Sequence, residues 1–493
     1  MIWVLWIVLG LVVFLVTLGD WVMGSAFMDP WTMESEVVMN ARNSGRITMI
    51  FGALVCGRLA DVYSRPLASV VGLLFFTLGC IICAAASGPV TFAAGTIIYM
   101  IGSAGLSLLV TTFIADHTSL RWRGLALSWT YFMPIIVMWI VNPLIVHVSW
   151  RWTYGMFAVM VPVLSIPALV VLFSAASGYR EEDNQPPWSE KIKNGIARMD
   201  LVGIILFTAG FGLIDYNTDV WYRETGTAPS PRQIAMLVVG FILLLPVFTI
   251  WELFFASAPF MPKRILTNRG AICAIIAVFL YRLASVSSSR VLINFSSFGS
   301  WTPYDLGLLI SSWSMAYSSF APFVGAAFLL TRRYKPHVLG GNGISILGAG
   351  LGVHAARLAR RPNTPPSRAL LFAMQVLKGL GGVVIELGLM VGAQASVTHN
   401  DLVTVIVLMT IWPTFGVSLS SALNRAVLGR ADADSPKFIT LYALAVGLSF
   451  LCLIASLFMP NYVLKSEHNV LEDPMEQVGE DTTSNIDRRA LSP

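Results

Sequence analysis

The amino-acid sequence predicts an all-α membrane protein with about fourteen transmembrane helices. Of its 493 residues, 56% are hydrophobic and only 12% are charged, whereas a soluble domain carries about 25% charged residues. Apolar runs of about 20 residues recur almost from one end of the chain to the other, and each is long enough to cross a bilayer as a helix. Helices satisfy their own backbone hydrogen bonds in lipid, so every span is expected to be helical.

The apolar runs divide the chain into two halves joined by a linking pair of helices. The first six spans are expected at 2–20, 45–59, 67–87, 92–114, 125–147 and 153–174. The linking pair follows at 200–219 and 233–255, and the last six spans at 270–293, 305–330, 338–356, 368–393, 401–425 and 437–459. We therefore expect an N-terminal six-helix bundle over 1–177, a cytoplasmic linker over 178–198, two linking helices over 199–256, a C-terminal six-helix bundle over 257–460 and a polar tail over 461–493.

Basic residues indicate which ends of the spans face the cytoplasm. With a cytoplasmic N-terminus, five inward connectors are basic, as the positive-inside rule expects. These connectors hold Arg58 and Arg65; Arg121 and Arg123; Arg180, Lys191, Lys193 and Arg198; Lys263, Arg264 and Arg269; and Arg332, Arg333 and Lys335. One outward connector, HAARLARRPNTPPSR at 354–368, carries four arginines and disagrees. Since the basic residues lie in these short connectors, the net charge of +5 does not indicate a nucleic-acid partner.

The hairpin between the second and third spans carries a distinctive pattern, CGRLADVYSRP at 56–66. Gly57 permits close helix approach, while Asp61 and Arg65 can form charged contacts around the turn. On its own, such a hairpin is also compatible with a solvated turn. The pattern G-x-L-A-D-x-x-x-R resembles the signature hairpin of the major facilitator superfamily, with Ser64 in place of a usual glycine. That resemblance implies the superfamily fold and a conformational latch on the cytoplasmic face.

A related segment occurs in the second half of the chain. GALVCGRLADVYSRP at 52–66 and GAAFLLTRRYKP at 325–336 both begin with Gly-Ala, leave a span, and end in basic residues and proline. The correspondence relates the second span to the tenth. This register is expected if the two six-helix halves are structural repeats, which is a common construction of transporters.

Further segments narrow the resemblance. ADHTSLRWRG at 115–124 places Asp116, Arg121 and Arg123 where the fourth span meets the cytosol, as members of the latch or as interfacial anchors. Other matching segments are SWRWTYGM at 149–156, GAQASVTHND at 392–401 and the tail MPNYVLKSEHNVLED at 459–473. Together these segments look like the fungal siderophore-iron transporter family, a fourteen-span branch of the superfamily. The similarity extends over about residues 10–470.

This resemblance implies a monomeric transporter for proton-coupled uptake of ferric hydroxamate siderophores by alternating access. The membrane would be the plasma membrane or that of an endosomal or vacuolar vesicle. The chain departs from the family pattern in two places: RADADSPK at 430–437 replaces a long outer loop, and the first span ends in Leu18-Gly19-Asp20 instead of Leu-Asp-Gly. The competing interpretation is an exporter, a drug or metabolite antiporter. However, the fifth span reads MPIIVMWIVNPL and lacks the Gly-rich kink of those antiporters.

Five charged residues lie within or at the ends of apolar spans: Asp20, Asp215, Arg282, Lys378 and Glu386. A charge is costly in hydrocarbon, so these side chains are expected to face a polar interior between the helices. Lys378 and Glu386 are eight residues apart, about 12 Å of helical rise, so they share a face without touching. We expect Glu386 and Asp20 to exchange protons, and Arg282 to hold an anionic substrate or to pair with an acid. Structural ion pairing is the alternative role for each.

Aromatic residues make up 11% of the chain. Because Trp and Tyr near span ends are typical interfacial anchors, we expect the mid-span Trp139, Tyr281 and Trp412 to line a substrate cavity. This choice sets aside four other aromatic residues: Trp129, Tyr131, Trp313 and Tyr317. The sequence has no metal-ligand cluster and no G-x-x-x-x-G-K-[ST] motif, so we expect no metal site, no cofactor and no ATP.

Two other classes of function serve as alternatives. A membrane-embedded enzyme requires a cluster of His, Asp or Ser at one membrane face, and the sequence shows no such cluster, so we expect no enzymatic activity. A transport-dead, receptor-like protein would bind the substrate without moving it across the membrane. The short connector at 430–437 is compatible with that alternative.

Overall fold

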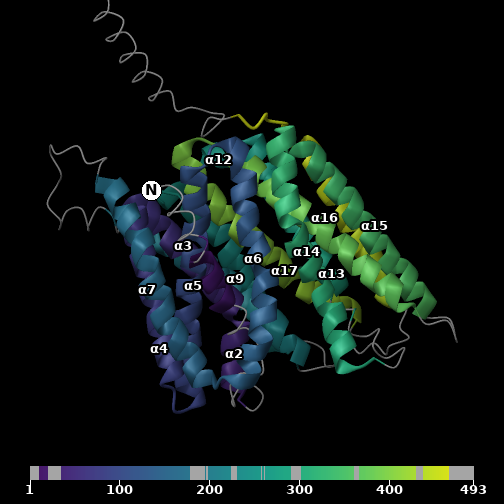
Figure 1. Ribbon diagram of the computed structural model, residues 1–493, viewed down its shortest axis with the longest axis horizontal. Helices are drawn as coiled ribbons and strands as arrows, with labels where there is room; N and C mark the ends of the chain where they lie inside the picture. The colour runs from purple at the N-terminus through teal and green to yellow at the C-terminus, as the bar shows by residue number, and fades with distance from the viewer. Residues whose placement is uncertain are drawn as a thin grey trace, which may run out of the picture.

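The computed structural model is a bundle of long helices arranged as two groups side by side (Figure 1). The structure describes residues 12–19, 35–177, 198–223, 230–256, 258–259, 261–289, 301–359, 366–428 and 437–465, together with positions 10, 195 and 292. Helices α3, α4, α5 and α7 lie on one side of the view, and α14, α15 and α16 on the other. Helices α6 and α17 lie between these two groups.

The N-terminal group is formed by helices that follow one another closely. Its members are the helical segment 12–19, α2 (Glu36–Asn43), α3 (Gly45–Val62), α4 (Arg65–Ala84), α5 (Pro89–His117), α6 (Leu120–His147) and α7 (Trp150–Ser177). The turn between α3 and α4 is short because Ser64 caps α4. Its Oγ accepts a hydrogen bond from the Leu67 N–H at 3.3 Å, and Pro66 lies in the first turn, where a missing N–H costs nothing.

The C-terminal group begins after the linking helices. It consists of α12 (Lys263–Thr267), α13 (Arg269–Ser289), α14 (Pro303–Thr331), α15 (Lys335–Ala359), α16 (Arg368–Ala395), α17 (Leu402–Leu428) and α18 (Lys437–Phe458). Helices α2 and α12 lie at opposite ends of the bundle in Figure 1. Each of them leads into a long helix, so α3 and α13 start from opposite ends.

The linking pair packs against both groups. It comprises α9 (Leu201–Arg223) and a second span built from α10 (Pro231–Ile242), α11 (Phe248–Ile250) and π-helical turns at Leu243–Val247 and Trp251–Phe255. Pro246 lies in the first π-helical turn, where its missing N–H is accommodated by the wider backbone. Helix α9 contacts α3 of the first group and α17 of the second.

Ten helices in the described ranges are long and apolar enough to cross a membrane. This finding confirms the predicted class, an all-α, multi-pass membrane protein. No helix was expected between the spans 2–20 and 45–59, whereas residues 36–43 form α2 and only Ser44 separates this helix from α3. Helical structure therefore begins earlier than the apolar run.

Small residues set the spacing between the two groups. Helix α3 packs on α17, and α6 packs on α14. A Cβ atom on Gly325 of α14 would lie 2.8 Å from the Leu125 Cα of α6, and one on Gly124 would lie 3.0 Å from the Phe328 ring. These helices therefore approach at a distance that only glycine permits. The repeated Gly-Ala segments predict that α3 of the first half corresponds to α14 of the second half. The packing of α3 on α17 and the packing of α14 on α6 are then equivalent contacts, each made by one of these two helices with the other half.

Candidate functional site

A cavity of about 530 Å³ lies between the two groups of helices. The segment 12–19 and helices α3, α5 and α6 line one side, and α13, α16 and α17 line the other. Three of its lining side chains are charged: Arg46, Arg282 and Glu386. A stripe of hydroxyl groups on α17, formed by Thr410 and Thr414, adds further polar lining. The volume falls within the range of about 300–1,000 Å³ that is typical of small-molecule sites.

On the C-terminal side of the cavity, Arg282 and Glu386 form an ion pair between α13 and α16. Arg282 Nη2 donates to Glu386 Oε2 at 2.9 Å, and Arg282 Nε lies 2.6 Å from Oε1. The Tyr317 hydroxyl of α14 donates to Oε2 at 2.6 Å. The carboxylate side chain is only 7% exposed, whereas the arginine side chain is 29% exposed. Glu386 is therefore held from two helices, with its charge compensated inside the bundle.

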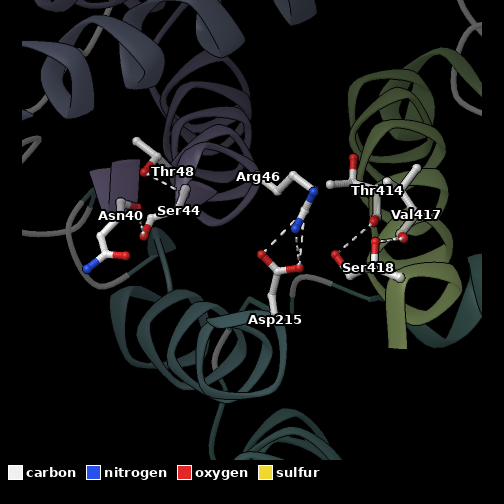
Figure 2. A network of polar contacts seen from close by, with 9 residues as sticks. Asn40, Ser44, Arg46, Thr48, Asp215, Thr414, Val417 and Ser418 are labelled. Atoms are coloured by element: carbon white, nitrogen blue, oxygen red, sulfur yellow. Dashed lines mark hydrogen bonds and ion pairs between the residues drawn. The ribbon is translucent and has the colours of Figure 1, made fainter. Parts of the chain in front are cut away.

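On the N-terminal side, Arg46 of α3 pairs with Asp215 of the linking helix α9 (Figure 2). Arg46 Nε donates to both oxygens of Asp215, at 3.1 and 3.4 Å, and Arg46 Nη2 lies 3.1 Å from Oδ1. The Asp215 side chain is 1% exposed and the Arg46 side chain 24% exposed. Figure 2 shows Arg46 extending between α3 and α17, with Thr414 and Ser418 on the α17 side.

The sequence singled out Asp215 but missed Arg46. Arg46 stands at the start of the expected span 45–59 but was not singled out, because polar residues precede it. The sequence signal that identifies it is an isolated basic residue at the start of a span, together with an isolated acid, Asp215, near the end of another. The two are 169 residues apart, so their pairing depends on the tertiary fold.

Lys378 is buried on α16, the helix that also carries Glu386, and is not among the residues that line the cavity. Its Nζ donates to the Ser288 Oγ at 2.6 Å and to the Ser285 carbonyl at 3.4 Å, both on α13. Lys378 therefore links α16 to α13. Asp20, the other predicted proton carrier, lies outside the described residues.

The aromatic residues differ from the expectation. Trp139 is 74% exposed and is not among the residues that line the central cavity, so the expected cavity position is wrong for it. Tyr281 is buried behind the cavity and is not one of its lining residues. Trp412 lines a different, apolar cavity of about 630 Å³ between the linking helices and α17. The central site instead has two tyrosines that were not expected there. Tyr131 lines the cavity, and Tyr317 donates a hydrogen bond to Glu386.

The end of the bundle that carries the α3–α4 turn, termed here the latch end, is closely packed. A Cβ atom on Gly57 of α3 would lie only 2.6 Å from the Val407 Cγ2 of α17. Asp61 lies near the charges of Arg58 and Arg65, and beside the Thr404 hydroxyl of α17. Arg58 Nη2 donates to the Ala258 carbonyl at 3.0 Å, just before α12. The hairpin thus contacts both the C-terminal group and the connector from the linking helices.

The remaining predicted latch residues join three helices of the N-terminal group. Arg65 at the start of α4 forms an ion pair with Asp116 near the end of α5, and the acid side chain is 5% exposed. Arg123 of α6 is buried, and its Nη2 donates to the carbonyls of Ala115 at 2.7 Å and Thr118 at 3.1 Å. A cation at this position complements the negative end of the α5 dipole.

Arg121 makes a main-chain contact with the end of the described chain. Its N–H donates to the Lys465 carbonyl at 3.0 Å. Residues 461–465, which we expected to belong to the polar tail, therefore lie along the latch end. Val463 pairs with Arg333 in the α14–α15 turn, and the Leu464 N–H donates to the Arg332 carbonyl at 2.9 Å.

The fold and the central cavity define a class of protein: a multi-pass membrane protein in which two helical groups enclose a polar site at their interface. The family model of the Major Facilitator Superfamily matches residues 9–300. The chain therefore belongs to the Major Facilitator Superfamily, as its α3–α4 hairpin predicted.

Named relatives are fungal. The chain is 29% identical to a siderophore transporter of Zymoseptoria tritici over 393 residues, covering 75% of this chain and 60% of that protein. It is 27% identical to the siderophore transporter fer7 of Mycosarcoma maydis, covering 89% and 75% of the two chains. It is also 28% identical to the low affinity heme transporter str3 of Schizosaccharomyces pombe, covering 79% and 63%. The match thus spans less than two thirds of the Zymoseptoria and Schizosaccharomyces relatives.

Solved structures agree on the fold. A bacterial homologue of the iron transporter ferroportin in an outward-facing state superposes with a TM-score of 0.60 at 11% identity, covering 92% of this chain and 98% of that one. The POT family transporter PepTSo gives a TM-score of 0.56 at 16% identity, covering 92% and 96%. At these identities the similarity concerns the fold alone.

Proposed function

We propose that the protein is a secondary active transporter that takes up ferric siderophores together with protons. The observation that carries this proposal is the central cavity, in which the Arg282–Glu386 pair lies between two helical groups that pack closely at the latch end. A polar site at the interface of two repeated halves is the arrangement that alternating access requires. The relatives named as siderophore transporters support the choice of substrate.

The latch end is the proposed inner gate. In the described conformation, α3 contacts α17 at Gly57 and Val407, and Arg264 of α12 forms an ion pair with Asp401 just before α17. In this proposal, these contacts close the path from the cavity toward the latch end. Substrate release on that side requires α3 and α17 to separate, and the charged hairpin that carries Asp61 and Arg65 would then exchange partners.

Glu386 is the proposed proton carrier. As a carboxylate it binds Arg282 and accepts a hydrogen bond from Tyr317. Protonation removes its negative charge and weakens its attraction for the guanidinium. Arg282 would then offer its Nε and Nη2 groups, in addition to Nη1, to a substrate group, which would couple proton binding to substrate binding. Asp20 is a second proposed carrier on the strength of the sequence alone.

Uptake in yeast cells that lack their own siderophore transporters tests this function. Cells expressing the chain should grow on a ferric hydroxamate and accumulate the ⁵⁵Fe-labelled chelate, and a protonophore should abolish the accumulation. Asp61→Asn should lower the uptake rate severalfold at unchanged abundance in the membrane. The matched control is Asp305→Asn, which removes an exposed acid paired with Arg368 outside the cavity.

The alternatives give different outcomes in the same cells. Resistance to a fungal toxin without accumulation of chelate would identify an exporter. Binding of the chelate at the cell surface without internal ⁵⁵Fe would identify a receptor-like protein. Normal uptake by Asp61→Asn would contradict the role of the latch while leaving the transport function intact.

A further inference from the structure

Two arginine–carboxylate pairs of the same design lie at the central cavity, one on each side. Arg46 comes from α3 and is held by Asp215, and Arg282 comes from α13 and is held by Glu386. In both pairs the carboxylate is nearly buried, at 1% and 7% exposure, while the arginine side chain is 24% and 29% exposed. Both arginines line the cavity. In each pair, therefore, the cation is the member that a ligand can reach more easily.

The contacts of the two arginines leave the same part of each guanidinium available. In both Arg46 and Arg282, the Nε and Nη2 groups contact the carboxylate. None of the described contacts uses Nη1 of either residue. A guanidinium carries five N–H donors in a rigid fork, so a carboxylate on one edge fixes its plane and leaves further donors for a second acceptor.

We propose that Arg46 and Arg282 together form a binding site for anionic oxygen groups of the substrate. This inference rests on the proposed transport function and names a substrate class, namely ferric chelates that carry an ionised carboxylate in addition to their iron-binding groups. Charge-assisted hydrogen bonds to arginine are the strong and directional contacts that such a group makes. The acids set the position of the arginines and lower the net charge of the empty cavity.

The linking helix α9 thereby contributes to the substrate site. Asp215 is a positioning residue, since it contacts Arg46 and is not among the residues that line the cavity. Helix α9 packs against α3 and α17, one helix from each half. A movement of α9 relative to α3 would release Arg46, so the linking pair would influence substrate affinity in addition to joining the halves.

Two probes with one chelating core test this site on the purified full-length chain in lipid nanodiscs. The first is the linear ferric trihydroxamate ferrioxamine B, whose free end is an ammonium. The second is its N-succinyl derivative, whose free end is a carboxylate. The double variants Arg46→Gln/Asp215→Asn and Arg282→Gln/Glu386→Gln remove a cation without leaving a buried acid unpaired. Arg368→Gln, from the exposed pair with Asp305, is the matched control.

The wild-type protein and the control should bind the succinyl derivative about tenfold more tightly than ferrioxamine B, because charge-assisted hydrogen bonds to arginine are stronger than neutral ones. Each double variant should reduce this preference to less than about threefold by weakening binding of the succinyl derivative. The charge exchange Arg46→Asp/Asp215→Arg should be more stable to heat than Arg46→Gln/Asp215→Asn, because it restores an ion pair. It should not restore the preference for the succinyl derivative, because it puts an acid on α3.

Four results would overturn the inference. Equal binding of both probes by the wild-type protein would show that the arginines do not select anionic groups, with the transport function unaffected. An unchanged preference in the double variants, or its full return in the charge exchange, would reduce both pairs to structural ion pairs. Binding of neither probe would contradict the siderophore function itself, and with it the substrate class named here.

Discussion

At Gly57, the absence of a side chain decides how closely α3 approaches α17. A methyl group there would lie 2.6 Å from the Val407 Cγ2 and 3.3 Å from the Leu108 Cδ2, so helix α3 or α17 would have to move. Overpacking of this kind typically costs about 1–3 kcal/mol. The cost applies to the conformation in which the latch end is closed, and it would disappear once the two helices separate.

Gly57→Ala should therefore lower the rate of chelate uptake severalfold at unchanged abundance in the membrane. The double variant Gly57→Ala/Val407→Ala should recover most of the rate, because it removes the methyl group that the new Cβ meets. Gly340→Ala on α15 is the matched control, since its Cβ would meet nothing within 4 Å. Equal rates for Gly57→Ala and Gly340→Ala would contradict a tight contact at the latch end.

At the scale of elements, the segment after α18 joins the latch end of both groups of helices. The Tyr334 hydroxyl in the α14–α15 turn donates to the Pro460 carbonyl, and Lys335 Nζ donates to the Leu457 carbonyl at 2.8 Å. Burial raises the pKa of Tyr334 above its ordinary value, so the phenol stays protonated and remains a donor. The same segment reaches α6 through Arg121 and Lys465.

Removing this donor with Tyr334→Phe should destabilise the protein by about 0.5–1.5 kcal/mol, because the partly buried Pro460 carbonyl loses its hydrogen bond. The measurement is the midpoint of thermal unfolding of the purified chain in detergent. Tyr216→Phe, at an exposed tyrosine of α9, is the control and should leave the midpoint unchanged. Identical midpoints for the two variants would mean that the Tyr334 contact contributes nothing to stability.

The helices could be predicted from the sequence because their cause is local. Long apolar runs, proline and serine at helix starts, and basic connectors are all readable along the chain, and they also placed Asp215, Arg282 and Glu386 inside the bundle. The partner of each charge could not be predicted. Arg46 meets Asp215 only because α9 packs on α3, and no pattern near either residue encodes that contact.

The prediction of which aromatic residues line the cavity was wrong for a related reason. Depth within a span does not say which side of the helix faces a cavity, because helix rotation is fixed by packing. Trp139 was therefore expected in the cavity but does not line it, while Tyr317 was not expected there and donates a hydrogen bond to Glu386. The hairpin motif was informative because its glycine and charges act near the turn itself, where position along the chain determines position in the fold.

At the scale of the whole molecule, each of the two halves contributes one arginine–carboxylate site to a shared cavity, and the linking pair supplies one of the acids. The closed contacts lie at the latch end, and the charged cavity lies between the halves. This arrangement fits the proposed transport, in which one half would move against the other around a site whose charges are already compensated.

Reconstitution into proteoliposomes tests the central claim most directly. With an inwardly directed proton gradient, vesicles containing the chain should accumulate a ⁵⁵Fe-labelled ferric hydroxamate above its outside concentration, and a protonophore should collapse the accumulation. Glu386→Gln should still exchange the labelled chelate for unlabelled chelate but should lose gradient-driven accumulation. The account would be contradicted if vesicles with the wild-type chain bound the chelate but did not accumulate it, or accumulated it equally without the gradient.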